Sequence, residues 1–330
     1  MKVLKPQKYT KSGGLETSML NADIKSFEFD SEFDGLRISA SIAVPSGQIN
    51  GIVQIVHGMY EYKERYYDFM DYLAEEGFIT VIHDNRGHGK SICSEDDLGF
   101  MYKNGGAGFV SDIAQVARIV KEAYPSHPYF MFAHSMGSLG ARCFLKEHDH
   151  MLNGLIVCGS PSYSRFSSFA RSIESAISQK LGSHFRSRKI YDIAESVLNK
   201  NFASENMKNA WLCSDPAVVD SFNNDPLSNF IFTLNGYESL LYLMKNTYSK
   251  KDWSVKNPSL PIRFVSGRED PCMLSEKKFM KAIEMLEKTG YSSVSHRLFD
   301  GMRHDIINEK NKTIVYKDVA KTLFSWIDRL

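Results

Sequence analysis

Residues 130–138 read Phe-Met-Phe-Ala-His-Ser-Met-Gly-Ser, a run of strand-forming residues that ends in a turn containing Ser135. The turn is a close variant of G-x-S-x-G, a pattern that places a serine between a strand and a helix with its Oγ above a sheet. Small residues two positions before and after the serine let the backbone make this turn without a side-chain clash. This chain has Ala133 at the first position and Gly137 at the second. The stretch predicts a strand–turn–helix unit that presents one candidate nucleophile.

Short apolar runs and amphipathic segments alternate along the rest of the chain. Segments 24–30 and 36–44 alternate apolar and polar residues around Asp34-Gly35, which predicts an antiparallel hairpin. Later apolar runs lack this alternation, as expected for strands buried on both faces of a parallel sheet: Ile52–His57, Phe78–His83, Tyr129–His134, Leu155–Cys158 and Ile262–Val265. Val294–Phe299 is predicted to form the last strand. Helical periodicity separates several of them: Arg65–Glu76, Phe109–Tyr124, Leu274–Lys288 and Ile314–Leu330. This order predicts an α/β fold, a mostly parallel sheet of about eight strands with helices on both faces.

Residues 160–253 interrupt this rhythm. The segment has no convincing buried strand, several amphipathic helical pieces and many aromatic residues. We therefore expect a helical cap over the carboxyl edge of the sheet, inserted between two parts of one core, residues 1–159 and 254–330. Since no internal repeat, low-complexity tract or linker is found, an independent second domain is not predicted.

Nucleophilic catalysis by serine requires a base that takes the hydroxyl proton and an acid that orients the base. Asp270 follows the fifth buried strand, at the edge where ligand-facing residues of open α/β sheets lie. His304 follows the last strand, so Ser135, Asp270 and His304 have the required types and chain order. Two other acids are worse placed, because Glu269 would point away from Asp270 in an extended loop and Asp305 adjoins the histidine. We predict that Ser135, Asp270 and His304 form a catalytic triad.

The same reaction needs N–H donors for the oxyanion that develops on the attacked carbonyl. One donor is expected from the residue after the nucleophile, here Met136. The second is expected from the loop after the third strand, which reads His57-Gly-Met-Tyr-Glu. Within that loop we choose the backbone N–H of Met59.

The composition limits the classes of function. The 330 residues are 43% hydrophobic and 24% charged, as is typical of a globular protein. The 40 basic and 39 acidic residues give a formal charge of +1, so no electrostatic footprint for nucleic acid is present. The five cysteines are scattered and lack a C-x-x-C pair, which favours free thiols in a reducing compartment. Without an apolar run typical of a signal peptide or membrane span, a cytoplasmic location is predicted.

Four stretches together resemble the α/β-hydrolase superfamily, and within it the monoacylglycerol lipase and lysophospholipase-like serine hydrolases. They are His57-Gly-Met-Tyr-Glu with Arg65-Tyr66 following, Asp84-Asn-Arg-Gly-His-Gly-Lys-Ser91, Ala133-His-Ser-Met-Gly137 and Gly301-Met-Arg-His-Asp-Ile-Ile-Asn-Glu309. Asp225-Pro226-Leu227 is similar to a motif in the cap of the same group. The resemblance spans roughly residues 50–310 and implies the α/β-hydrolase fold, a lid over the site and cleavage of glycerol esters or lysophospholipids. Ala133 stands where the family has glycine, and its methyl group removes no catalytic group.

The prediction is therefore a serine hydrolase that cleaves carboxylic esters through an acyl-enzyme and needs no metal or organic cofactor. The aromatic-rich cap suggests an apolar acyl group, because each buried CH₂ contributes roughly 0.8 kcal/mol; equally, these aromatics would form the cap's own core. The resemblance is compatible with transient contact between the cap and a membrane surface. The oligomeric state is not indicated by the sequence.

Three alternatives remain open at this point. A general carboxylesterase would use the same residues. A serine aminopeptidase similar to proline iminopeptidase would also need acidic cap residues for an α-ammonium group, and Glu174, Glu195 and Glu238 are available. A binding protein without activity would keep the fold but not the catalytic residues. The intact set of serine, acid and histidine argues against this alternative.

Some conspicuous residues are expected to be structural. Arg86 and His88 should brace the loop after the fourth strand rather than react. His134 flanks the nucleophile and is expected to pack away from it. A single histidine or arginine in such a position usually has a structural role.

Two further groups are interpreted as solvated surface. His148-Asp149-His150 offers two histidines without an independent third ligand, so a metal site is not predicted. Arg186, Arg188 and Lys189 form a basic patch that could contact anionic head groups, but a solvated helix face is the favoured interpretation.

Overall fold

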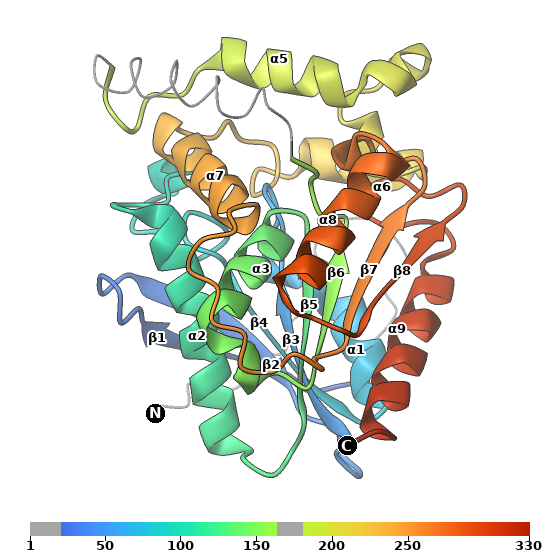
Figure 1. The fold of residues 1–330 in the computed structure, drawn as a ribbon. Helices are drawn as coiled ribbons and strands as arrows, with labels where there is room; N and C mark the ends of the chain where they lie inside the picture. Colours follow the sequence, from blue (N-terminus) through green and yellow to red (C-terminus); the bar gives the residue numbers. More distant parts are fainter. Residues whose placement is uncertain (1–20, 164–180) are drawn as a thin grey trace.

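In the computed structural model, which describes residues 21–163 and 181–330, eight strands form one sheet in the order β1-β2-β4-β3-β5-β6-β7-β8 (Figure 1). The strands are β1 (Ile24–Asp30), β2 (Arg37–Ala43), β3 (Gly51–Val56), β4 (Phe78–His83), β5 (Tyr129–His134), β6 (Gly154–Cys158), β7 (Ile262–Gly267) and β8 (Val294–Phe299). β1 pairs antiparallel with β2, β2 pairs antiparallel with β4, and all other pairs are parallel. The predicted hairpin and the mostly parallel sheet are confirmed.

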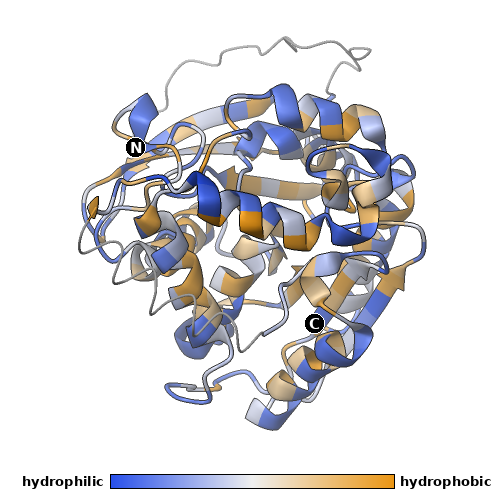
Figure 2. Ribbon diagram, turned by 90° about the horizontal axis from the view of Figure 1, so that it is seen from above, coloured by the Kyte–Doolittle hydropathy of each residue, from blue (hydrophilic) through white to orange (hydrophobic). Residues whose placement is uncertain are grey.

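Helices cover both faces of this sheet. The described residues contain the helices α1 (Tyr67–Glu75), α2 (Gly105–Ala123), α3 (Met136–His148), α5 (Arg188–Leu198), α6 (Pro216–Asn224), α7 (Leu234–Thr247), α8 (Glu276–Thr289) and α9 (Lys312–Ile327). α1 and α9 share one apolar core with the sheet, while α2, α3 and α8 share the other. Seen from above, the surrounding helices alternate hydrophobic and hydrophilic residues, as amphipathic helices on a buried sheet should (Figure 2).

Helix α2 begins at Gly105, four residues before the predicted start at Phe109. The extra turn is rich in glycine, which disfavours a helix on propensity alone. Tertiary packing explains the difference, because a Cβ on Gly108 would lie 2.3 Å from Cζ of Arg86. The close approach of the guanidinium needs a residue without a side chain here, so packing overrides the local preference.

Arg86 is fully buried and holds three segments together. Its Nε donates to Oδ2 of Asp112 on α2 at 2.8 Å, and its Nη1 donates to Oδ2 of Asp34 in the β1–β2 turn at 2.9 Å. A buried charge is tolerated only when it is paired and hydrogen-bonded in this way. The predicted bracing role of Arg86 is confirmed.

Between β6 and β7, residues 181–253 contain α5, α6 and α7, and α5 lies across the top of the molecule (Figure 1). The only β pairing among these residues is an isolated bridge between Arg186 and Thr233. Phe166 and Phe169, two of the aromatic residues in the predicted cap, and the acid Glu174 lie outside the described residues. No helix in the described part of the chain is both long and apolar enough to cross a bilayer.

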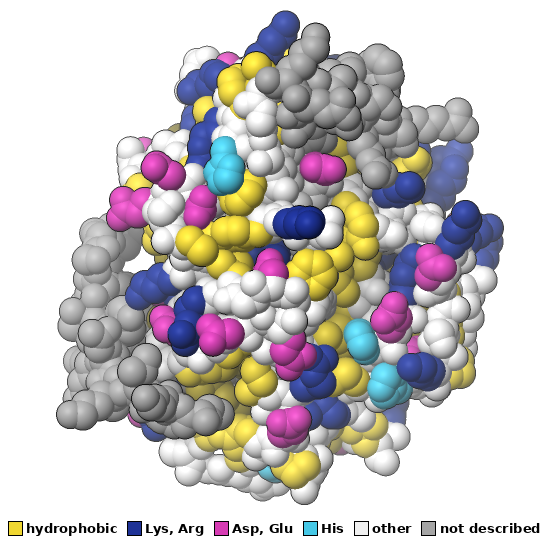
Figure 3. All heavy atoms as spheres, turned by 90° about the vertical axis from the view of Figure 1, so that its left-hand side faces the viewer, with side chains coloured by type: hydrophobic (Ala, Val, Ile, Leu, Met, Phe, Trp, Pro, Cys, Tyr) yellow, Lys and Arg dark blue, Asp and Glu magenta, His cyan; other side chains and the backbone are white. Residues whose placement is uncertain are grey.

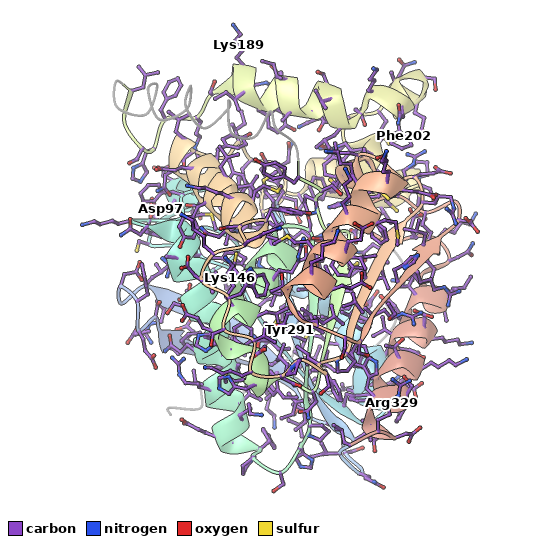
Figure 4. The ribbon with its side chains drawn as sticks, in the orientation of Figure 1. Asp97, Lys146, Lys189, Phe202, Tyr291 and Arg329 are labelled. Atoms are coloured by element: carbon purple, nitrogen blue, oxygen red, sulfur yellow. The ribbon has the colours of Figure 1, made fainter. Side chains whose placement is uncertain are left out.

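The interpretation of residues 186–189 as one solvated face is wrong for Arg186. Its guanidinium donates to the carbonyl oxygens of Leu98 and Asp96 and to that of Ile231. Arg188 pairs with Asp192, and Lys189 points outward from α5 (Figure 4). Arg186 therefore anchors this segment to the loop 95–98 and is not available to an outside anion.

The motif His148-Asp149-His150 is also only partly solvated. Asp149 is fully buried, and its Oδ2 accepts hydrogen bonds from Lys256 N, Asn257 N and Tyr291 OH at 2.9 to 3.1 Å. The carboxylate therefore fixes the chain entering β7. Elsewhere on the surface, the face shown in Figure 3 carries basic and acidic side chains interspersed with apolar ones, in keeping with the balanced net charge.

Candidate active site

Ser135 occupies the turn between β5 and α3 in a strained backbone conformation. Its φ of 51° and ψ of −121° are rarely adopted by residues other than glycine. The Ser135 N–H donates to Cys158 O of β6 at 2.9 Å, and Ser138 Oγ donates to Ser135 O. Strain held in place by such contacts is typical of a nucleophile presented on a strand–helix turn.

Asp270 and His304 lie together at the carboxyl ends of β7 and β8. His304 Nδ1 donates to Asp270 Oδ1 at 3.0 Å, which leaves Nε2 of the same ring to act as an acceptor. Asp270 also accepts from Ser266 Oγ and from Cys272 N, both at 2.8 Å. Burial works to raise the pKa of Asp270, but His304 and these hydrogen bonds outweigh it and hold the pKa below its ordinary value. The carboxylate is therefore ionised and fixed in position.

A cavity of about 170 Å³ connects the predicted residues. Ser135, His304, Met59 and Met136 all line it. Within the described structure Ser135 and His304 share this cavity without a direct hydrogen bond, which is common when no substrate is bound. The rest of the lining is mainly apolar and includes Leu198, Trp211, Leu212, Phe222, Leu240 and Met244.

The residues of the two predicted oxyanion donors line the same cavity as Ser135. Met136 opens α3, where the first backbone N–H groups have no partner inside the helix. Met59 lies in the loop after β3, between Gly58 and Tyr60, and Tyr60 has a positive φ of 64°. A Cβ on Gly58 would lie 2.8 Å from Ser135 Cβ, so this loop packs directly against the serine. Both donors thus border the space in front of Ser135.

A buried network beside the serine was missed by the sequence reasoning. Oε2 of Glu61 accepts from Gly58 N at 2.7 Å, from Tyr66 OH at 2.9 Å and from His134 Nδ1 at 2.9 Å. The other ring nitrogen of His134 donates to His304 O at 3.2 Å. His134 therefore does not simply pack away from the nucleophile: it joins the loop of Met59 to the loop of His304.

Both ring nitrogens of His134 face acceptors, so the ring is a charged imidazolium. Burial lowers the pKa of His134, but the Glu61 carboxylate outweighs it and raises the pKa to about 9. For Glu61, burial acts to raise the pKa, and His134 and Arg65 hold it well below its ordinary value. The sequence offered one hint of this pair: the stretch His57–Glu61 ends in a carboxylate, Glu61, to which the sequence analysis gave no role.

Asp305 and Glu269, the two acids judged less well placed than Asp270 to orient the histidine, have other partners. Asp305 accepts from Arg65 Nη2 at 3.1 Å and from Asn308 Nδ2 at 2.9 Å. Glu269 is half exposed, with its carboxylate 4.0 Å from Arg303 Nε. Among the described residues, neither acid is hydrogen-bonded to the His304 ring, whereas Asp270 is.

Two groups of metal-ligating side chains occur among the described residues: Asp270, Cys272, His304 and Glu61, His134, Asp305. In each group a histidine is already hydrogen-bonded to a carboxylate, His304 to Asp270 and His134 to Glu61, and His134 carries a proton on each ring nitrogen. Arg65 also adds a cation beside the second group. Because metal ligation needs a free imidazole lone pair, the second donor set does not suit a metal ion.

Comparison with known proteins places these residues in a family context. The family model Hydrolase_4, described as serine aminopeptidase S33, matches residues 47–311, a range that contains every predicted site residue. A monoacylglycerol lipase of Mycolicibacterium smegmatis is 21% identical over 293 residues, which cover 89% of this chain and 93% of that protein. Phospholipase YtpA of Bacillus subtilis is 23% identical over 272 residues, covering 81% of this chain and 92% of that protein.

A solved structure supports the same assignment. A thermostable carboxyl esterase from Bacillus coagulans, determined in complex with glycerol, superposes with a TM-score of 0.85 at 26% identity. The similarity covers 92% of this chain and 99% of the esterase. The described fold is therefore shared along nearly the full length of that enzyme.

Proposed function

The chain belongs to the serine aminopeptidase S33 (Hydrolase_4) family of α/β-hydrolases, and from that premise we propose that it is a serine ester hydrolase of monoacylglycerol or lysophospholipid-type lipids. The observation that carries the proposal is the strained Ser135 in one cavity with His304, whose ring is hydrogen-bonded to Asp270. An esterase or lipase activity agrees with the relatives' names. The substrate class and the role of each residue are our proposal.

In the proposed mechanism Ser135 Oγ attacks the ester carbonyl while His304 Nε2 takes its proton. Asp270 holds the imidazole through Nδ1 and stabilises its charged form. The N–H groups of Met59 and Met136 donate to the oxyanion. His304 then protonates the leaving alcohol, and water activated by the same ring releases the acid from Ser135.

The apolar wall of the cavity supports an acyl substrate. Phe222, Leu240 and Met244 face the space next to Ser135, and each CH₂ buried there would contribute roughly 0.8 kcal/mol. We propose that residues 160–253 act as a cap over this space. On α5, Ile193 and Val197 are 55% and 62% exposed, which supports a transient contact of the cap with a membrane surface.

An aminopeptidase is less well supported by the described residues. It would need an unpaired carboxylate for the substrate's α-ammonium group. Glu195 already accepts from Asn209 N and from Trp211 Nε1, and Glu238 is exposed and does not line the cavity. The two carboxylates that line the cavity wall, Glu61 and Asp305, are both neutralised by buried cations.

One assay separates these functions. We expect rapid turnover of p-nitrophenyl acyl esters and little turnover of proline p-nitroanilide. Cleavage of the anilide without a preference for esters would contradict the ester hydrolase and support an aminopeptidase. A general carboxylesterase is distinguished by a series of acyl esters of increasing length, because it would show no gain with chain length.

A further inference from the structure

His57 directly follows β3 and is fully buried, and the proposed mechanism gives its ring no role. Its Nε2 lies 2.9 Å from the backbone nitrogen of Asn85, in the loop after β4. A backbone nitrogen can only donate, so Nε2 is the acceptor and the ring proton is on Nδ1. Nδ1 lies 2.8 Å from Gly58 O and therefore donates to this carbonyl oxygen. The surroundings thus fix one tautomer of His57.

The ring of His57 is also held in its neutral form. Burial lowers the pKa of His57 and outweighs the carboxylates of Asp84 and Glu61, which act to raise it. A second proton, on Nε2, would face the N–H of Asn85. Asn85 fixes the residue in another way, because its Nδ2 donates to His57 O at 2.9 Å. The same Nδ2 lies 3.1 Å from His57 Nδ1, but both atoms are donors, and each donates to a carbonyl oxygen instead.

The contact with Gly58 O acts on the proposed oxyanion donor through one rigid unit. Gly58 O and the N–H of Met59 belong to the same peptide group, which is planar and trans. In a trans peptide group the carbonyl and the N–H point in opposite directions. Because Gly58 O points at the His57 ring, the N–H of Met59 points away from it. Among residues 21–163 and 181–330 this N–H meets no acceptor, so it is available to a ligand.

The glycine before Met59 leaves this peptide group free to turn. A Cβ on Gly58 would lie 2.8 Å from Ser135 Cβ, so the close approach to the serine requires glycine. Glycine also allows many backbone conformations, and the two peptide groups that flank it can rotate separately. Glu61 accepts from the N–H of Gly58, which belongs to the preceding peptide group. In the described part of the chain, only His57 donates to the peptide group that carries the N–H of Met59.

We propose that His57 is a positioning residue, which directs the N–H of Met59 toward the oxyanion through its hydrogen bond to Gly58 O. The inference rests on the proposed ester hydrolase function, because it concerns the donor of that reaction. Without the bond the peptide group would be free to turn and to bring Gly58 O toward the developing negative charge. The transition state would then lose part of the stabilisation that the donor supplies.

The kinetic test compares two replacements of His57. His57→Leu removes the donor and should lower kcat for a p-nitrophenyl ester about tenfold to a hundredfold, since complete loss of an oxyanion donor costs on the order of 10² to 10³. KM should change by less than about threefold, because the contact matters in the transition state. His57→Asn keeps an amide N–H near the position of Nδ1 and should return kcat to within about fivefold of the wild type.

A matched control and a second variant protect this test from general damage to the fold. His83→Leu removes another fully buried histidine, whose ring nitrogens have no hydrogen-bond partner in the described residues, and should leave kcat unchanged. If His57→Leu does not fold, His57→Gln takes its place. The longer side chain puts its amide at the position of Nε2, where it accepts from Asn85 N but does not reach Gly58 O. His57→Gln should therefore lose rate as His57→Leu does, while His57→Asn keeps it.

Binding of a tetrahedral adduct separates positioning from a merely structural role. In an alkyl trifluoromethyl ketone, Ser135 Oγ bonds to the carbonyl carbon, its proton passes to His304 and the carbonyl oxygen becomes an oxyanion. The methyl ketone of the same chain length fills the cavity without forming this charge. His57→Leu should weaken binding of the trifluoromethyl ketone at least about tenfold, and that of the methyl ketone less than about twofold.

The outcomes keep the inference apart from the proposed function. Equal weakening of both ketones, or an unchanged kcat in a folded His57→Leu or His57→Gln, would overturn the role of His57 and leave the ester hydrolase standing. A wild type that hydrolyses no ester would contradict the proposed function, and the two ketones, titrated calorimetrically, would then decide the inference. If the wild type also shows no preference for the trifluoromethyl ketone, the inference fails with the function.

Discussion

The two sides of the catalytic cavity are held by different forces. The polar side, Glu61, Arg65, His134 and Asp305, is a set of buried charges joined by hydrogen bonds. The apolar side, Trp211, Phe222, Leu240 and Met244, is held by packing between side chains of residues 181–253. The polar side contacts the loops that carry the proposed oxyanion donor and base, and the apolar side encloses the space for a substrate.

Because of this difference, we expect the polar side to determine the reaction rate and the apolar side to determine which acyl chains are accepted. Hydrogen bonds are directional and costly to leave unmade when buried, so a change on the polar side should alter rates and stability. Apolar contacts depend on volume and tolerate substitution, so a change on the apolar side should alter chain-length preference. Each variant below tests one part of this division.

The largest effect is expected at the chemistry itself. Ser135→Ala should lower the kcat for ester hydrolysis by a factor on the order of 10⁴ to 10⁶, because the nucleophile is lost. Asp270→Asn should lower it by about 10⁴, since the imidazole loses its orienting carboxylate. Steady-state rates with a p-nitrophenyl ester measure both. A loss below tenfold in either variant would contradict its assigned role.

The polar side also predicts a pH dependence of stability. The pKa of His134 is raised from 6.5 to about 9, so its charged form stabilises the folded protein fully below pH 6.5. That stabilisation, at most about 3 kcal/mol, is lost as the pH rises from 6.5 to 9, because the unfolded chain releases the proton first. Urea unfolding at several pH values measures it. His134→Gln should flatten the curve between these limits, and an unchanged slope would contradict the charged pair.

A conservative change at Glu61 tests its positioning role. Glu61→Gln removes the charge that holds His134 and the N–H of Gly58, so the Met59 loop should lose its fixed position. We expect kcat to fall tenfold to a hundredfold, about 1.4 to 2.7 kcal/mol, with KM nearly unchanged. Glu238→Gln, an exposed carboxylate on α7, is the matched control. A rise in KM alone would show that Glu61 acts on substrate binding and not on the oxyanion loop.

A volume change on the apolar side should move specificity rather than rate. Met244→Ala enlarges the cavity wall, so the preferred acyl chain should lengthen by one or two carbons. Each added CH₂ would change kcat/KM by roughly fourfold, from about 0.8 kcal/mol of burial. A series of p-nitrophenyl esters from acetate to decanoate measures the shift. If the chain-length profile keeps its shape, Met244 does not contact the acyl group.

The smallest effect is expected for the unusual residue of the turn. Ala133 is fully buried at the end of β5, two residues before the serine. Ala133→Gly should destabilise the fold by about 1 kcal/mol through lost burial and greater chain entropy. Ester kcat should stay within about twofold, since no catalytic group changes. A tenfold change in rate would mean that the methyl group helps to set the conformation of Ser135.

The strands could be predicted from the sequence because their positions follow from local pattern, and the same pattern suggested the proposed acid and base at strand ends. β5 and β7 are short apolar runs, and Asp270 and His304 lie in the loops that follow β7 and β8. In a parallel sheet all such strand ends lie on one edge, so the spacing along the chain did not matter. The 3.0 Å contact between Asp270 and His304 fits that reasoning.

The Glu61–His134 pair could not be predicted in the same way. The two residues are 73 positions apart, and their contact depends on the positive φ of Tyr60 and on the path of the loop after β3. Arg186 was misjudged for a similar reason, because the carbonyl oxygens it binds belong to loops distant in sequence. The hydrophobic pattern of the sequence predicts which residues lie on strands and helices. The conformation of the loops determines which polar groups form hydrogen bonds, and the pattern does not predict it.

The central claim is that Ser135 carries the acyl group during turnover. Mixing the protein with excess p-nitrophenyl ester and stopping the reaction early in acid should give a burst of about one p-nitrophenol per chain. Peptide mass mapping should then find a single acyl adduct, on the peptide containing Ser135. Ser135→Ala should show neither burst nor adduct. An adduct on another residue, or a burst that persists in Ser135→Ala, would contradict the account.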